Sequence, residues 1–206
     1  TGVREELACL FEERGGLDGV VTKPFNPLTF NKKIKEILEP DSIRNLSFMA
    51  RLAIEANSYT IARTMISKIK EKREHVIALS LQGDMEFYQG QRLLKDPETR
   101  KRAVNHFKSA LGHYQEALNK NPNSIHPLKR VKETYELMHP FLKGMEDGNL
   151  KSILSCLERL NKINGLNPER YVETGKVLLD LDRDQEAFNS FNRAEQACTR
   201  IAAGRD

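Results

Sequence analysis

The sequence contains no tryptophan, only three cysteines, and no long uninterrupted run of apolar residues. Three widely spaced cysteines (Cys9, Cys156 and Cys198) are an odd number and do not suit a disulfide framework, which favours a reducing compartment. A membrane-spanning helix needs roughly 18 consecutive apolar residues, and no signal-peptide pattern is present. We therefore expect a cytoplasmic protein that does not contact the membrane.

The sequence also lacks the motifs that usually carry catalysis or metal binding. No Ser-His-Asp arrangement, glycine-rich phosphate loop or His-Glu-x-x-His pattern occurs. His106 and His113 stand seven residues apart, but no Cys, Asp or further His completes a zinc-ligand spacing, so we expect histidines on the surface. These observations predict no enzyme, no metal site and no cofactor in this chain.

Charge is abundant but evenly mixed. Lys and Arg number 33 against 29 Asp and Glu, for a formal net charge of +4, and the two signs alternate along most of the chain. Such mixing is typical of solvated helix faces and not of a basic patch that binds phosphate backbones. We expect no nucleic-acid partner.

The clearest positive signal is a stripe of alternating small and large residues. Ala103, Ala110 and Ala117 recur every seven residues, with Phe107 and Tyr114 four residues after the first two. Residues three and four apart share one face of a helix. Alanines on that face allow a second helix to approach closely while the rings fill the space beside it. The stripe predicts a buried face on a helix that pairs with a neighbour.

The order Ala110, Tyr114, Ala117 and Pro122 resembles the second helix of a tetratricopeptide repeat (TPR). The family's small, aromatic and small positions recur elsewhere, with the same twelve-residue step from Ala50 to Ala62 and from Gly175 to Ala187. Further matching positions are Leu46, Ala53, Ile66 and Ile69 in the earlier copy, and Tyr171, Leu178, Phe191 and Ala194 in the later copy.

The resemblance implies a mainly all-α fold of antiparallel helical hairpins stacked in a right-handed superhelix. We expect a repeat domain over residues 41–203, with repeats at about 43–75, 76–124, 125–167 and 168–201. In the second repeat, the step from Gly83 to Ala110 is fifteen residues longer than the twelve-residue step of the other copies. Because four helical turns need about 14.4 residues, both of its helices can be longer without rotating their apolar faces.

Stacked hairpins of this kind offer a groove lined by the first helix of each repeat. An apolar and basic groove suits an amphipathic helix or an acidic segment of a partner protein. The repeat phase predicts these groove residues: Arg44, Ser47, Arg51, Ile54, Val172, Lys176 and Leu179.

The first forty residues predict a different order of secondary-structure elements from the rest of the chain. A short amphipathic helix is expected over residues 5–14, a β-branched strand at residues 19–22, and a second helix over residues 29–38 with Phe30, Ile34, Ile37 and Leu38 on one face. Helix, strand, Lys-Pro-Phe and helix are half of an α/β unit, and not part of a helical repeat.

That segment, residues 1–40, resembles the last third of a two-component receiver domain, in which a buried strand ends in Lys-Pro and a final helix follows. The resemblance implies that Lys23 contacts a phosphoryl group and that Thr1, twenty-two residues earlier, is the switch hydroxyl. It also implies Mg²⁺ and a phosphoacceptor Asp in the complete domain, so we expect this segment to be the remnant of a longer receiver.

Together these features predict a protein-interaction scaffold that serves as the output module of a bacterial response regulator, with a sensor histidine kinase as a further partner. Phosphorylation is expected to move the helix before Pro40, and thereby to expose or cover the groove or to alter homodimer formation. The alternative is a free-standing TPR adaptor or co-chaperone, without a phosphorelay role, whose first forty residues are an N-terminal cap.

Overall fold

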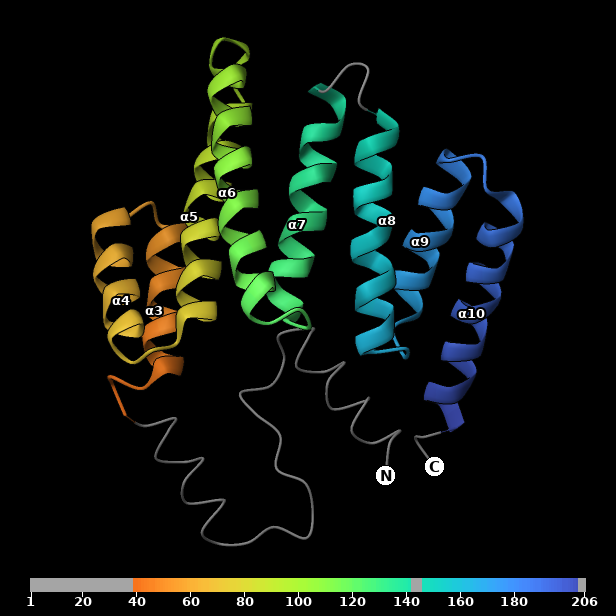
Figure 1. Cartoon of the computed structure of the whole chain (residues 1–206), viewed down its shortest axis with the longest axis horizontal. Helices are drawn as coiled ribbons and strands as arrows, with labels where there is room; N and C mark the ends of the chain where they lie inside the picture. The colour runs from red at the N-terminus through yellow and green to blue at the C-terminus, as the bar shows by residue number, and fades with distance from the viewer. Residues whose placement is uncertain (1–38, 142–145, 204–206) are drawn as a thin grey trace, which may run out of the picture. The chain divides into compact units, whose positions relative to one another are not determined.

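The computed structural model describes residues 39–141 and 146–203, and this part of the chain is α-helical without a β-strand (Figure 1). The expectation of an all-α fold is confirmed for these residues. The expected α/β segment covers residues 1–40, and its residues 1–38 lie outside the described part of the chain. None of the described helices is both long and apolar enough to cross a membrane. The elements are α3 (Ile43–Glu55), α4 (Tyr59–Glu71), α5 (His75–Leu94), η1 (Pro97–Thr99), α6 (Arg100–Lys120), α7 (Ile125–Met138), η2 (His139–Phe141), α8 (Glu146–Ile163), α9 (Pro168–Asp180) and α10 (Asp184–Ala203).

The described chain divides into two compact units, and the boundary falls inside α7 between Arg130 and Val131. We call residues 39–130 the N-terminal unit and the described residues from 131 onward the C-terminal unit. In the N-terminal unit α3 pairs with α4 and α5 with α6, and α5 also packs on the α3–α4 hairpin. In the C-terminal unit α9 pairs with α10, and α8 packs on α9.

Helix boundaries follow from local sequence signals. Ser42 caps α3 by accepting a hydrogen bond from the amide of Asn45 at 3.2 Å. Asn167 caps α9 in the same way, ahead of Pro168 at the first helical position. Asn57 and Asp182 each take a left-handed conformation at a helix-to-helix turn, with φ of 60° and 56°. Asn and Asp tolerate this conformation better than most side chains, so both turns are encoded locally.

The long α5–α6 hairpin is held by two contacts between glycine and an aromatic ring. The ring of Tyr114 lies directly against Gly83, and the ring of Phe107 lies against Gly90. A Cβ atom at Gly90 would stand only 2.7 Å from Cε1 of Phe107. The α9–α10 hairpin repeats the arrangement with Gly175 and Phe191. Glycine therefore sets the close approach of the helices in both units.

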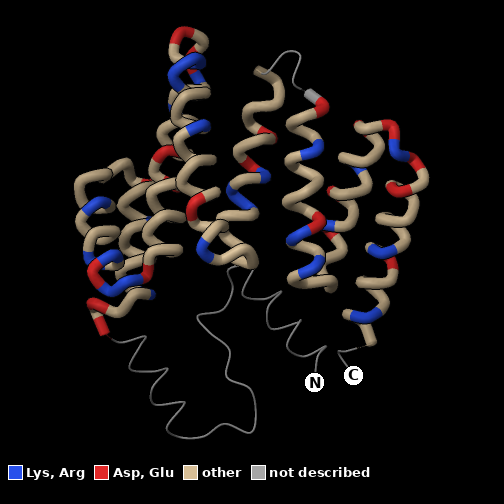
Figure 2. Tube along the Cα trace, viewed as in Figure 1, with Lys and Arg blue, Asp and Glu red and all other residues tan. Residues whose placement is uncertain are grey.

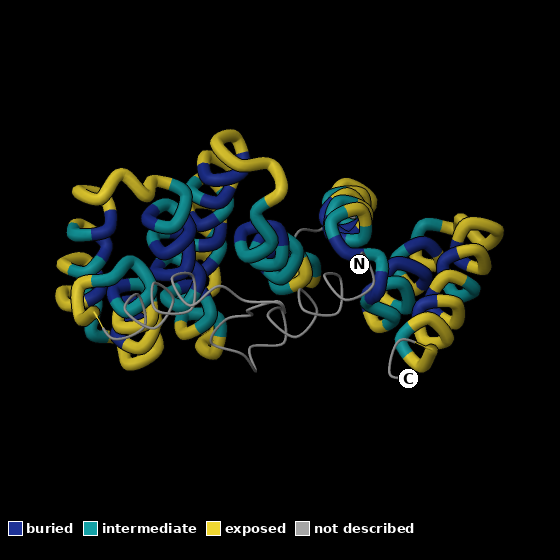
Figure 3. Tube along the Cα trace, turned by 90° about the horizontal axis from the view of Figure 1, so that it is seen from below, coloured by how far each residue is buried: buried dark blue, intermediate teal, exposed yellow. Residues whose placement is uncertain are grey.

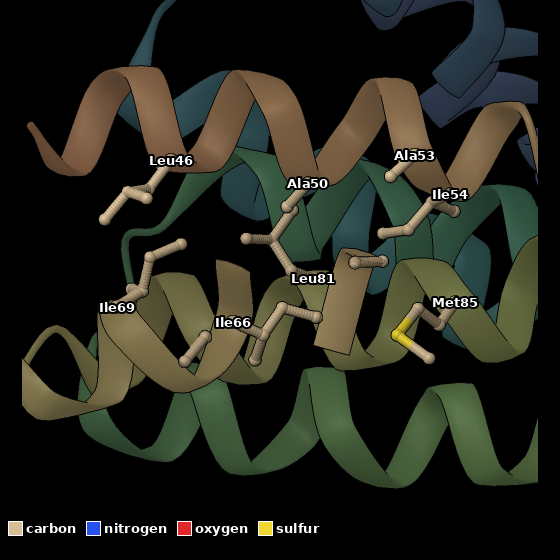
Figure 4. Packing of buried hydrophobic residues seen from close by; sticks show 10 residues of the cluster. Leu46, Ala50, Ala53, Ile54, Ile66, Ile69, Leu81 and Met85 are labelled. Atoms are coloured by element: carbon tan, nitrogen blue, oxygen red, sulfur yellow. The ribbon is translucent and has the colours of Figure 1, made fainter. Parts of the chain in front are cut away.

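Buried side chains form the predicted stripes. All five members of the stripe on α6 are buried with 0% exposure, which confirms the prediction from their spacing. In the N-terminal unit, α3, α4 and the start of α5 share one apolar cluster, in which Leu46, Ala50 and Ile54 face Ile66 and Ile69 across the hairpin (Figure 4). The exposed residues lie on the outer faces of the helices (Figure 3), and they include large apolar side chains such as Phe48 and Phe188 as well as polar ones.

The second hairpin is overlong as expected, because α5 and α6 contain 20 and 21 residues. Gly148 and Asn149 are residue types that favour turns, but α8 begins at Glu146 and runs through both of them. Asn149 is buried in the helix, and its side-chain amide donates to the carbonyl of Tyr135 at 3.3 Å. This tertiary hydrogen bond favours helix at a position where sequence propensity favours a turn.

Candidate partner-binding surfaces

The C-terminal unit contains a groove of about 520 Å³ between α8, α9 and α10. Its rim carries charges of both signs, as the mixed colours along these helices suggest (Figure 2). Asn161 in this groove donates from its side-chain nitrogen to Oγ1 of Thr174 at 3.2 Å, but its buried side-chain oxygen has no hydrogen-bond partner in the described part of the chain. We call this the C-terminal groove; its lining includes Glu158, Asn161, Lys162, Tyr171, Thr174, Asn189 and Arg193.

The N-terminal unit contains a smaller groove of about 330 Å³ between α4, α5 and α6. His113 in this groove has a buried Nδ1 atom without a hydrogen-bond partner among the described residues. Charges of both signs again line the surface. We call this the N-terminal groove; its lining includes Arg63, Ser67, Lys70, Gln82, Glu86 and His113.

The two grooves occupy equivalent places in the two units. Gln82 and Thr174 each stand immediately before the glycine that contacts an aromatic ring, and both line their groove. His113 and Ser190 each stand immediately before that aromatic residue, and they line the same grooves. The hairpin geometry thus produces the same hollow twice, while the side chains that line it differ.

A buried charged cluster fixes the start of α7 to the α5–α6 hairpin. Asp84 on α5 is 2% exposed and accepts a hydrogen bond from the hydroxyl of Tyr114 on α6 at 2.9 Å. His126 on α7 brings Nε2 within 2.8 Å of one carboxylate oxygen, and Nε of Arg130 lies 3.2 Å from the other. We call these four residues the Asp84 cluster.

The electrostatics of the Asp84 cluster keep the buried carboxyl ionised. Burial by itself raises the pKa of Asp84, but the nearby His126 and Arg130 and the hydrogen bonds from His126 and Tyr114 outweigh it, so that the pKa lies below its ordinary value of 3.8. The guanidinium of Arg130 also lies 4.8 Å from the ring centroid of Phe87 and 5.2 Å from that of Tyr88. The guanidinium of Arg130 thus contacts α5 both through its charge and through its flat surface, and both contacts hold the start of α7 in place. The Asp84 cluster therefore has a structural role.

The groove residues predicted on α3 divide between surface and core. Arg51 is exposed, and Arg44 and Ser47 are half-buried. Ile54 has 0% exposure and belongs to the apolar cluster beneath α3, so it offers no surface to a partner. The hydroxyl of Ser47 donates to the carbonyl of Ile43 in its own helix at 2.6 Å.

The groove residues predicted on α9 all reach the surface. Lys176 is exposed, Leu179 is 46% exposed, and Val172 is half-buried. They belong to the C-terminal unit, whereas the residues on α3 belong to the N-terminal unit. None of the predicted residues lines either of the two grooves described above.

Four of the five histidines are half-buried, and only His75 is exposed as expected. His106 and His126 are half-buried, and each bonds to a carboxylate of another helix, at 2.7 Å to Glu86 and at 2.8 Å to Asp84. Within residues 39–141 and 146–203, no group of three or more His, Cys, Asp or Glu side chains is placed to hold a metal ion. The expected phosphoryl-sensing residues Thr1 and Lys23 lie outside the described residues.

The sequence contained signals for the Asp84 cluster that the repeat pattern hides. His126 and Arg130 stand four apart at the start of a helix and therefore share one face, and Asp84 is an acidic residue next to the glycine of a buried helix face. A carboxylate on a buried face needs hydrogen-bond donors or a positive charge nearby. His126 and Arg130 can provide both. The grooves had no such signal, since three helices contribute to each of them.

Comparison with known proteins gives little beyond the structure itself. No family model matches the sequence, and no curated protein matches it either. Among solved structures, the crystal structure of MamA is similar to this chain, with a TM-score of 0.49 and 14% sequence identity over 96% of this chain and 97% of that chain. A similarity at this level carries no argument about function, so the fold rests on the hairpin geometry described above.

Proposed function

We propose that this chain is a protein-binding scaffold of TPR-like helical hairpins, with repeats at about 43–75, 76–124, 125–167 and 168–201. The observation that supports the proposal is the recurrence of one groove in two units, each lined by charged and hydrogen-bonding side chains. Such a lining suits a polypeptide segment with charged side chains, because it provides partners for both signs and for backbone amides. The unpaired oxygen of Asn161 would accept one of those amides.

The C-terminal groove allows a direct test. Lys162 lies in the groove, whereas Lys151 is exposed on the same helix outside it. An array of peptides is probed with the purified chain and with the Lys162→Glu and Lys151→Glu variants. We expect a set of peptides that bind the unchanged chain and the Lys151→Glu variant, and that bind the Lys162→Glu variant at least about tenfold more weakly, a loss of about 1.4 kcal/mol.

Peptide affinities that are the same for all three proteins, or the absence of any binding peptide, would contradict a role for the C-terminal groove. The groove residues predicted from the repeat phase form a second proposed surface on each unit. On the N-terminal unit they are Arg44, Ser47 and Arg51, and on the C-terminal unit they are Val172, Lys176 and Leu179. If Lys176→Glu weakened peptide binding and Lys162→Glu did not, the partner would contact the outward face of α9 instead.

A more specific proposal is that the scaffold is the output module of a response regulator. It is supported by the Lys23-Pro24 resemblance and by the short connection to α3. The carbonyl of Glu39 accepts hydrogen bonds from the amide of Ser42 at 3.0 Å and from the side chain of Asn45 at 2.5 Å. A movement of the segment before Glu39 would therefore act directly on the start of α3.

Phosphorylation tests this second proposal on the protein extended upstream of Thr1. A small phosphodonor with Mg²⁺ is added, and the intact mass is read together with that of the Lys23→Ala variant. We expect a phosphoryl adduct and a change in the bound peptides of the unchanged protein. An unmodified, folded protein would favour the alternative of a free-standing adaptor, while the peptide array would still report on the scaffold.

A further inference from the structure

The two grooves occupy equivalent places but differ in charge. Among the described residues, the C-terminal groove is lined by two carboxylates and two cations, so its side-chain charges cancel: Glu158, Glu186, Lys162 and Arg193. The described lining of the N-terminal groove contains two cations, Arg63 and Lys70, and one carboxylate, Glu86. A polypeptide that enters the N-terminal groove therefore meets a surplus of positive charge.

The cations of the N-terminal groove stand on one face of α4. Arg63 and Lys70 are seven residues apart with Ser67 between them, and all three side chains are exposed. Seven residues of α-helix span about 10.5 Å, so the two charges stand two turns apart. Neither Arg63 nor Lys70 forms an ion pair within the described part of the chain. Both charges are therefore available to a ligand.

The carboxylate of the N-terminal groove already has a partner inside the chain. Oε2 of Glu86 on α5 lies 2.7 Å from Nδ1 of His106 on α6, and both side chains are half-buried. This contact directs the carboxylate toward α6. The cations on α4 are thus left without a carboxylate partner from α5.

Apolar and hydrogen-bonding side chains complete the lining. Ile66 and Met85 are only 3% and 6% exposed and belong to the apolar cluster of the unit (Figure 4), yet both also line the groove. Gln82 provides an amide, and His113 provides a ring whose Nδ1 atom has no hydrogen-bond partner among the described residues. This lining suits an acidic side chain, whose methylene groups can lie against apolar atoms while its carboxylate accepts hydrogen bonds.

We propose that the N-terminal groove binds an acidic segment of a partner protein and holds its glutamate or aspartate carboxylates between Arg63 and Lys70. The inference rests on the proposed scaffold function and adds the charge of the partner. Two cations without a carboxylate partner attract an acidic segment and repel a basic one, so they determine which partners are accepted. The C-terminal groove, whose charges cancel, lacks this preference.

Fluorescence anisotropy with labelled peptides tests the proposal at an ionic strength of about 0.15 M. One probe alternates glutamate with alanine, so that its glutamates share one face of an extended chain at a spacing of about 7 Å. The other probe carries glutamine in place of glutamate. The chain is unchanged or carries Arg63→Gln together with Lys70→Gln, and this groove variant isolates the two cations.

A matched control carries Lys72→Gln together with Arg102→Gln. Both of these cations are exposed on the same unit, and neither lines the groove. The control loses the same net charge as the groove variant, so a difference between the two cannot come from long-range attraction alone. All four substituted side chains are exposed, and circular dichroism verifies that both variants are folded.

We expect the glutamate probe to bind the unchanged chain about tenfold more tightly than the glutamine probe. The groove variant should lose about tenfold in affinity for the glutamate probe, and the control should stay within about twofold. Glu86→Gln should act in the opposite direction and tighten this binding by about twofold, because it removes a carboxylate from the lining. A gain in affinity cannot result from a disturbed fold.

Three results would overturn the proposal. Equal losses in the groove variant and the control would show that the attraction does not come from the groove. Equal binding of the two probes would show that carboxylates are not recognised. Binding of a third peptide, with phosphoserine in place of glutamate, that is more than about tenfold tighter would assign the groove to phosphorylated segments instead.

Lys162→Glu separates this proposal from the scaffold function. It should leave the affinity for the glutamate probe within about twofold, although it weakens binding to the C-terminal groove. If array peptides bind the C-terminal groove and the glutamate probe does not bind, the preference for acidic segments is wrong while the scaffold function stands. If neither the array peptides nor the probe bind, both proposals are wrong.

Discussion

The ring of Tyr114 on α6 occupies the space beside Gly83 on α5 that any side chain at that position would need. The same ring carries the hydroxyl that donates to Asp84, the next residue after the glycine. One side chain thus sets both the distance between the two helices and one contact of the buried charge. The hairpin and the attachment of α7 are stabilised through the same contact.

Gly83→Ala should destabilise the N-terminal unit. A methyl group gains up to about 1 kcal/mol in helix propensity, but overlap with a packed ring costs about 1–3 kcal/mol or more, so we expect a net loss of about 1–2 kcal/mol. Gly112→Ala is the control, because a Cβ atom added at Gly112 in α6 would meet no neighbouring atom within 4 Å. This change should stabilise the chain by about 0.5–1 kcal/mol. Urea unfolding followed by circular dichroism measures both. A stabilising Gly83→Ala would contradict the close contact.

Asp84→Asn should be among the most destabilising single changes in the N-terminal unit. It keeps the shape of the side chain but removes the charge that His126 and Arg130 face, and breaking one partner of a buried ion pair costs about 3–5 kcal/mol. Asp41→Asn is the control, since the bridge from Asp41 to Lys68 is exposed and such pairs contribute less than about 1 kcal/mol. The unfolding midpoints of the two variants measure the difference. A similar loss of stability in both variants would show that Asp84 is not tightly coupled to His126 and Arg130.

The cluster also predicts an acid dependence of stability. Because the pKa of Asp84 in the folded chain lies below its ordinary value of 3.8, the unfolded chain takes up the proton first as the pH falls. The stabilisation is complete above pH 3.8 and is lost as the pH falls through the lowered folded pKa. The gap in unfolding free energy between the unchanged chain and Asp84→Asn should therefore narrow below about pH 4. A constant gap from neutral pH to pH 3 would refute this dependence.

The two described cysteines should differ strongly in reactivity. Burial raises the pKa of the Cys156 thiol to about 11, whereas Cys198 is exposed on α10. At pH 8 only about one in a thousand Cys156 side chains is then the reactive thiolate, and it is also shielded. We expect iodoacetamide to modify Cys198 and to spare Cys156 until denaturant is added, as read by peptide mass. Equal rates in the native chain would mean that α8 is not packed as described.

The helices and their buried faces could be predicted from the amino-acid pattern alone. The small-and-large stripe of α6 and the twelve-residue steps predicted which residues are buried, because a helix must hide an apolar face whatever surrounds it. The caps at Ser42 and Asn167 were equally readable, since capping is a local interaction. The turn that contains Asn57 has an equally local cause, because Asn tolerates the left-handed conformation found there.

Which polar residues are buried, and where the surface is hollow, depends on how the helices pack against one another. Asp84 lies in the same helix face as its apolar neighbours, and its donors come from α6 and α7, far away in the chain. Ile54 and Arg51 both follow the groove phase, yet one is buried and the other exposed, because α4 and α5 cover only part of that face. Each groove arises where three helices meet. Periodicity along one helix gives the direction of each side chain, but the neighbouring helices decide whether that direction leads to core, to a groove or to solvent.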